Sequence, residues 1–182
     1  MLYLFGFERV GVVLSDLYFV NPDPAPGQEG AERGVRLEVR FLERQDEQGS
    51  IYAARPILVG QPIWRVDLLE SVDGKPGSFD RTHHHPLMRG WEPGRRRFER
   101  DLSADPFGWL GERLRDLPGL LVQAELPADR ADADDARQMR ESAAEIVDAT
   151  RQLLDRVRAG ELARPPAESA EEPAGLARTG WL

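Results

Sequence analysis

The sequence contains no cysteine. Disulfide bonds, iron–sulfur clusters, thiolate zinc sites and cysteine nucleophiles are therefore excluded. It also lacks the GxGxxG, Walker A, GxSxG and HExxH patterns, which excludes the nucleotide-cofactor, hydrolase and zinc-protease families that carry them. These absences leave open whether the chain is an enzyme at all, so any chemistry must come from other residue types.

Long uninterrupted apolar runs are also missing. The first twenty residues are largely apolar, but Glu8, Arg9 and Asp16 interrupt them. They have neither a basic leader nor a cleavage site of small residues, as a signal peptide would, and they do not suit a membrane span. We therefore expect a cytoplasmic protein without a membrane partner.

Positive charge is scarce overall but concentrated in one place. The net charge is −8 over 182 residues, which argues against a general nucleic-acid binder. Residues 81–100, however, carry six arginines against Glu92 and Glu99, so this stretch is locally basic. The same stretch holds all three histidines of the chain, in the block SFDRTHHHPLMRGWEPGRRRFER that begins at Ser78. A local site for an anion is compatible with the acidic whole.

The first half of the chain has the pattern of antiparallel strands. We expect strands at Val10–Val20, Gly34–Arg44, Ile51–Val59 and Ile63–Val72, with turns at QDEQGS and at Gly60–Pro62. In the second of these, apolar residues alternate with Arg36, Glu38 and Arg40, which is typical of a half-buried strand. A further short strand is expected around Arg96–Leu102. Short turns between successive strands predict an antiparallel meander of about four to six strands.

Helical periodicity begins at Ser103. Apolar residues recur at helical spacing from Phe107 to Leu117, and Pro118-Gly119 is expected to stop that helix. Residues 120–126 (LLVQAEL) are expected to form a strand or an extended connector. A long amphipathic helix is predicted from about Asp129 to Ala159, with one apolar stripe and one charged face. The fold class is therefore α+β: a meander packed against two helices.

These patterns predict a single domain over residues 1–160, β-rich over 1–102 and helical over 103–160. Residues 161–182 are rich in Pro, Ala and Glu and are predicted to form a disordered acidic tail, ending in Trp181-Leu182.

The histidine block allows a metal site. In an extended chain His83 and His85 point to the same side, with Cα atoms about 6.6 Å apart, so both imidazoles can reach one ion. A carboxylate would complete the site: Asp80 is close in sequence, and Asp67 lies on the preceding strand. Zinc or manganese would suit such ligands, with His83, His85 and Asp80 as the candidate set.

The same block also allows an anion site without a metal. Arg65 and Asp67 are two residues apart on a strand, so they share a face that can meet the histidine loop. A histidine can exchange protons near neutral pH, which makes His83, His85 and Asp67 candidate catalytic residues. Arginines would bind a phosphate-bearing ligand or RNA, and the candidates are Arg65, Arg81, Arg89, Arg95 and Arg97.

Two further interpretations remain open. The histidines can be structural loop residues whose rings bond to the backbone. The chain can also be an interaction module without chemistry that docks a protein partner through residues 130–182, which include the long helix and the Trp-Leu end. The length of that helix also allows a homodimer.

The segment WRVDLLES…SFDRTHHHP resembles two groups of proteins. One is a domain of unknown function in small, arginine-rich α+β proteins of actinobacterial type. The other is the TumE-type toxin component of bacterial toxin–antitoxin pairs. The resemblance covers residues 50–117 and rests on Arg65, Asp67, His83, His84, His85 and Pro86. It implies a toxin-like or RNA-directed role with a partner protein.

Overall fold

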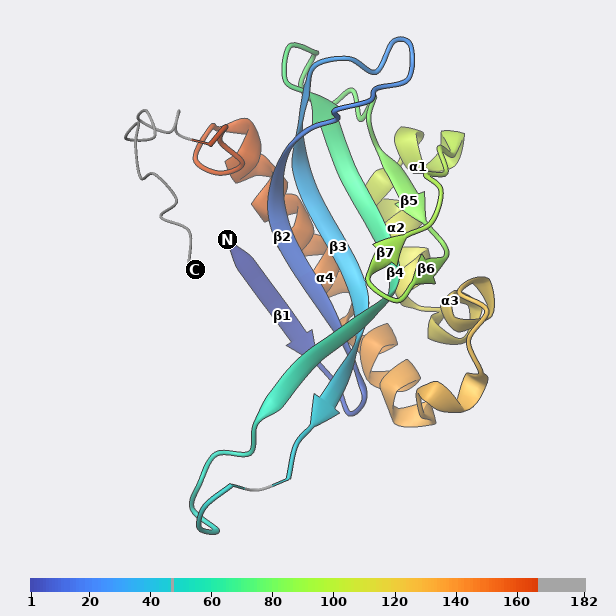
Figure 1. Ribbon diagram of the computed structural model, residues 1–182. Helices are drawn as coiled ribbons and strands as arrows, with labels where there is room; N and C mark the ends of the chain where they lie inside the picture. Colours follow the sequence, from blue (N-terminus) through green and yellow to red (C-terminus); the bar gives the residue numbers. More distant parts are fainter. Residues whose placement is uncertain (47, 167–182) are drawn as a thin grey trace, which may run out of the picture.

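The computed structural model describes residues 1–46 and 48–166 and shows an α+β fold (Figure 1). A five-stranded antiparallel sheet has the strand order β1-β2-β3-β4-β5, so each strand lies beside its neighbour in sequence. The strands are β1 (Leu2–Gly6), β2 (Val10–Val20), β3 (Ala31–Arg44), β4 (Ile57–Ser71) and β5 (His83–His85). A small hairpin of β6 (Met88–Arg89) and β7 (Glu92–Pro93) follows. The predicted meander is confirmed.

The second half of the chain is helical. It contains α1 (Arg100–Ala104), α2 (Pro106–Leu114), α3 (Leu117–Gln123), the 3-10 turn η1 (Ala128–Arg130) and α4 (Ala133–Arg158). Aspartates cap three of these helices: the side chains of Asp105, Asp116 and Asp132 accept hydrogen bonds from backbone N–H groups of the first turn. Such caps satisfy donors that have no partner within the helix.

The helices cover one face of the sheet, which we call the apolar face (Figure 1). Alternate residues of β2, β3 and β4 supply it, and cross-strand register brings Leu14, Leu37 and Val66 side by side. The apolar stripe of α4 lies against these strands, with Met139 and Ile146 fully buried. The stripe that could have formed a dimer is therefore used in the core of the chain itself.

Two predicted strands are in fact one. Strand β4 continues through Gly60-Gln61-Pro62, where we expected a turn, and residues 51–56 are not in a strand. Pro62 has no N–H to donate to the ladder, and the register between β3 and β4 shifts at Arg40 to accommodate it. The proline therefore marks an irregularity within the strand.

Two other predictions were wrong. We expected Pro118-Gly119 to stop a helix and residues 120–126 to form a strand or connector, but residues 117–123 form α3. Asp116 caps this helix, and Pro118 lies in its first turn, where a missing N–H is harmless. In the predicted strand at Arg96–Leu102, Arg97 forms a single bridge to His84, and α1 already begins at Arg100.

The chain remains in contact with the body after α4. The backbone N–H of Ala163 donates to Asp16, and the Ala163 side chain is buried. The predicted tail, with Trp181 and Leu182, otherwise lies outside the described residues. Within residues 1–46 and 48–166, no helix is long and apolar enough to cross a membrane.

Candidate functional site: an Asp-His-His cluster on the polar face of the sheet

The histidine block forms β5, which pairs with β4 in register His85–Arg65, His84–Val66 and His83–Asp67. Because side chains alternate along a strand, His84 enters the apolar face, while His83 and His85 lie on the opposite side. The prediction that His83 and His85 share a side is confirmed. We call this second side the polar face; its charged and polar residues on β3, β4 and β5 include Arg36, Glu38, Arg40, Arg65, Asp67, His83 and His85.

Backbone carbonyls fix the tautomers of His83 and His85, the two histidines on the polar face. Nδ1 of His83 lies 2.8 Å from the carbonyl oxygen of Arg81, and Nδ1 of His85 lies 2.8 Å from that of Gly94. A carbonyl oxygen can only accept, so each Nδ1 carries the hydrogen and donates it. Whenever such a ring is neutral, its Nε2 is left with a free lone pair that can face Asp67 or a metal ion.

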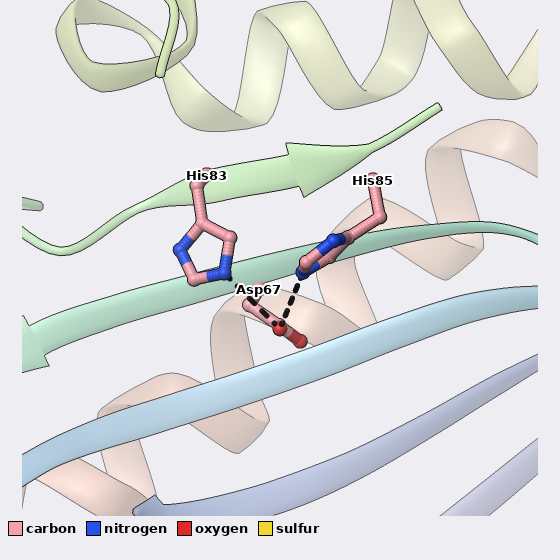
Figure 2. A group of neighbouring side chains, drawn as sticks. All are labelled: Asp67, His83 and His85. Carbon is pink, nitrogen blue, oxygen red and sulfur yellow. Dashed lines mark ion pairs between the residues drawn. The ribbon is translucent and has the colours of Figure 1, made fainter. Parts of the chain in front are cut away.

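The two Nε2 atoms face the same carboxylate oxygen (Figure 2). Oδ2 of Asp67 lies 3.5 Å from Nε2 of His83 and 3.7 Å from Nε2 of His85. One ligand atom from each of these residues lies within 4.8 Å of the others, and all three side chains are buried. Asp67, His83 and His85 thus form a compact Asp-His-His cluster, which a single metal ion could join.

Asp67 is ionised despite its burial. Burial alone would raise its pKa, but hydrogen bonding from His85 and from Arg36 outweighs this and holds the pKa well below its ordinary value. The guanidinium of Arg36 donates to both oxygens, with Nε 2.7 Å from Oδ1 and Nη2 3.1 Å from Oδ2. This bidentate contact fixes the orientation of the carboxylate.

His83, by contrast, is neutral. Burial lowers its pKa from 6.5 to about 4, and the attraction of Asp67 does not restore it. At neutral pH its ring is therefore in the form that can ligate a metal.

The cluster opens into a cavity of about 280 Å³. Three arginines line it together with the cluster: Arg36, Arg65 and Arg96. Arg65 is held by Glu38, whose Oε1 lies 2.7 Å from its Nε, and Arg96 lies 3.8 Å from the buried Glu32. The cavity thus combines two imidazoles and one carboxylate with guanidinium groups that can bind an anion.

The structure places Asp80, the carboxylate of the predicted metal set, away from the two histidines. Asp80 is outside the cluster: its Oδ1 accepts from the backbone N–H of Ser71 at 3.0 Å and from the hydroxyl of Ser78 at 2.7 Å. Its role is to hold the turn that leads into β5. Asp67, the other carboxylate considered for the metal site and a catalytic candidate, lies beside both histidines instead.

The structure separates the predicted arginines into three groups. Arg65 lines the cavity as expected. Arg81 is directed elsewhere, because its guanidinium donates to the backbone carbonyls of Gly27 and Glu29. Arg89, Arg95 and Arg97 line a different groove.

Sequence reasoning missed Arg36 and Glu38 as parts of the site. Their alternation within β3 was clear from the sequence, but it was read as an ordinary solvent-exposed face. Only the register, which pairs Arg36 with Asp67 and Glu38 with Arg65, reveals their role.

The middle histidine has a structural environment. His84 lies between Trp64 and Trp109, with ring centroids 6.1 and 5.2 Å away, and its Nε2 is 2.8 Å from Oε1 of Glu99. Glu99 also accepts from the indole N–H of Trp109. These contacts join β5 to the helices and give His84 a structural environment. The ring-to-backbone bonds of the structural interpretation are made by His83 and His85, whereas the ring of His84 bonds to a side chain.

Comparison with known proteins finds no matching family model, curated protein or solved structure for this chain.

Proposed function

We propose that the protein binds one divalent transition-metal ion through Asp67, His83 and His85, and that this centre acts on an anionic ligand. The observation that carries the proposal is the convergence of three acceptors: two Nε2 lone pairs and a carboxylate oxygen, at 3.5 and 3.7 Å. Acceptors held this close repel one another unless a proton or a cation lies between them.

A cation accounts for the arrangement better than a proton does. One proton could join Asp67 to one imidazole, but the other Nε2 would still face a carboxylate oxygen without a hydrogen between them. The burial that lowers the pKa of His83 to about 4 also opposes protonation of that ring. A metal ion would serve all three acceptors together.

The surroundings of the cluster are those of metal-binding histidines. Ligating histidines usually donate their second N–H to a carbonyl or carboxylate, and ligating carboxylates accept further hydrogen bonds. Here the carbonyls of Arg81 and Gly94 hold the two rings, and Arg36 holds Asp67. Two imidazoles and one carboxylate suit Zn²⁺, Mn²⁺ or Fe²⁺, and three protein ligands leave coordination positions open.

The arginines of the cavity indicate the charge of the ligand. Arg65 and Arg96 line the cavity beside the cluster, so they can bind a carboxylate or phosphate group and orient it. A metal ion in such a site polarises an oxygen of the bound anion or activates water. Metal-assisted hydrolysis or transfer at a phosphate-bearing substrate, including the toxin-like action on RNA that the resemblance implies, belongs to this proposal, as does a cytoplasmic location.

Metal content tests the proposal, measured by mass spectrometry on tag-free protein because a histidine tag binds the same ions. We expect close to one ion per chain in the wild type. His83→Ala and His85→Ala should each weaken metal binding by more than about 100-fold, beyond what loss of a supporting residue causes. Asp67→Asn should have a similar effect.

Two matched variants distinguish the centre from adventitious binding. His84→Gln removes the neighbouring imidazole and keeps a donor for Glu99, and Asp80→Asn alters the nearby carboxylate that lies outside the cluster. Both should retain the ion. Equal metal loss in His84→Gln and His83→Ala, or a wild type without bound metal after incubation with Zn²⁺, Mn²⁺ or Fe²⁺, would refute the proposal.

A further inference from the structure

A second groove lies beside the Asp-His-His cluster. It encloses about 640 Å³ and is lined by Pro86, Leu87, Pro93, Gly94 and three arginines, Arg89, Arg95 and Arg97, which define the arginine groove. Pro93 also lines the cavity of the cluster, and the carbonyl of Gly94 holds His85. One short segment, residues 93–97, therefore separates the two sites and contributes to both.

Alternation along this segment assigns its arginines to different sites. Arg96 lines the cavity of the cluster, whereas Arg95 and Arg97 line the arginine groove. This is the pattern of an extended chain, in which successive side chains point to opposite sides. The three consecutive arginines, Arg95 to Arg97, therefore contribute to two different sites. The sequence alone could not show this division.

The arginines of the groove differ from those of the polar face in their partners. Arg36, Arg65 and Arg96 each have a carboxylate within 4.0 Å. Within residues 1–46 and 48–166, the side chains of Arg89, Arg95 and Arg97 make no ion pair, hydrogen bond or ring contact, and all three residues are exposed. Three like charges gathered without a counter-charge, in a chain of net charge −8, are arranged for an external anion.

The groove is also preformed. The backbone N–H of Gly94 donates to the carbonyl of Leu87 at 2.8 Å, and Arg97 exchanges two backbone hydrogen bonds with His84. A Cβ at residue 94 would lie 2.8 Å from the Leu87 carbonyl oxygen, so this approach of the two backbones requires glycine. Pro86 and Pro93 further restrict the walls. A rigid groove loses little entropy when it binds a ligand.

We propose that the arginine groove is a binding site for the phosphate groups of a phosphate-bearing ligand. Guanidinium groups donate in pairs to phosphate oxygens, and three of them suit an anion with several charges better than a single carboxylate. No aromatic side chain lines the groove among the described residues, so it offers no stacking surface for a base. Recognition therefore rests on the phosphates of a nucleotide or a nucleic-acid strand.

The test uses full-length protein treated with EDTA, so it does not depend on the proposed metal centre. Tripolyphosphate is titrated at low ionic strength by calorimetry. Arg95→Gln/Arg97→Gln should weaken its binding by about tenfold or more, because two of the three guanidinium groups that donate to the phosphate oxygens are lost. Arg115→Gln, which removes an exposed arginine that does not line the groove, is the matched control and should change the affinity less than about twofold.

A single-stranded RNA 12-mer, titrated in parallel, identifies the source of the phosphate. Tighter binding of the RNA than of tripolyphosphate, with both weakened by the double variant, indicates a strand; the reverse order indicates a nucleotide-like ligand. The proposal is overturned if neither probe binds, or if the double variant binds both as the Arg115→Gln control does. Metal content measured on the same variants should be unchanged, which keeps this test separate from that of the Asp-His-His cluster.

Discussion

The two faces of the sheet are built from the same strands and serve different purposes. In β3, Val35, Leu37 and Val39 enter the core under the helices, while Arg36 and Glu38 alternate with them on the polar face. Both faces are buried at their centre: Leu37 is fully buried, and Asp67 and His83 are 2% and 1% exposed. Burial of apolar groups stabilises the fold, whereas burial of charges at best offsets its own desolvation.

This difference indicates that the polar face is not there for stability. A buried ion pair can often be replaced by apolar residues of similar volume without loss of stability. Stability alone therefore does not explain the buried charges of Arg36, Asp67, Arg65 and Glu38. A role in binding the metal ion and its anionic ligand does explain them. The comparison predicts that substitutions on the two faces affect different properties of the protein.

The largest expected loss of stability is on the apolar face. Leu37→Ala should lower the free energy of unfolding by about 2–5 kcal/mol, because it opens a cavity in the sheet–helix core. Urea denaturation of metal-free protein measures this. The folded variant should still bind one metal ion per chain, since Leu37 points away from the cluster. Loss of the ion along with the stability would show that the two faces are not separable.

On the polar face, the matching test is a substitution of Arg36, the neighbour of Leu37 in β3. Arg36→Gln leaves Asp67 buried with its counter-charge removed, and should destabilise the metal-free protein by about 3 kcal/mol. Adding Asp67→Asn should recover part of this, because the uncompensated charge is then gone. Zn²⁺ should also raise the melting temperature of Arg36→Gln more than that of the wild type, since the ion replaces the lost charge.

Arg40→Gln is the control on the same strand and face. Its partner Glu38 keeps a second arginine, Arg65, so the loss should be smaller, below about 1 kcal/mol. If Arg36→Gln were as stable as Arg40→Gln in metal-free protein, the account of Asp67 as a buried charge held by Arg36 would be wrong.

The smallest effect is expected at Glu32. Burial raises its pKa in spite of the attraction of Arg96 and Arg81, and its carboxylate oxygens find no hydrogen-bond partner within the described chain. The folded state therefore holds a proton on Glu32 more tightly than the unfolded state does. The stability that this provides is present below the unfolded pKa of about 4.5 and is lost as the pH rises through the folded pKa.

Glu32→Gln should consequently raise the free energy of unfolding by about 1 kcal/mol at neutral pH. The gain should shrink toward pH 4, where Glu32 is protonated in both states. Urea denaturation at several pH values measures it, with Glu29→Gln as the control that should give no gain, because the pKa of the exposed Glu29 is lowered. A gain that is equal at pH 4 and pH 7 would contradict the assignment.

Features that depend only on a local residue pattern could be predicted from the sequence. Alternation in Gly34–Arg44 predicted the two faces of β3, and the spacing of His83 and His85 predicted that they share a side. What it could not supply was register: nothing local indicates that Arg36 lies beside Asp67, or that Asp67 rather than Asp80 completes the cluster. Proline was the other source of error, because Pro62 and Pro118 were read as breaks although a bulge and a first helical turn accept them.

The most direct measurement of the central claim is anomalous X-ray diffraction from crystals of tag-free protein soaked in Zn²⁺. The account predicts one strong anomalous peak on the polar face, about 2.0–2.1 Å from Nε2 of His83 and of His85 and about 2.0–2.2 Å from an oxygen of Asp67. A peak bound to His84 or Asp80, or a fully ordered Asp-His-His cluster with no anomalous density, would contradict it.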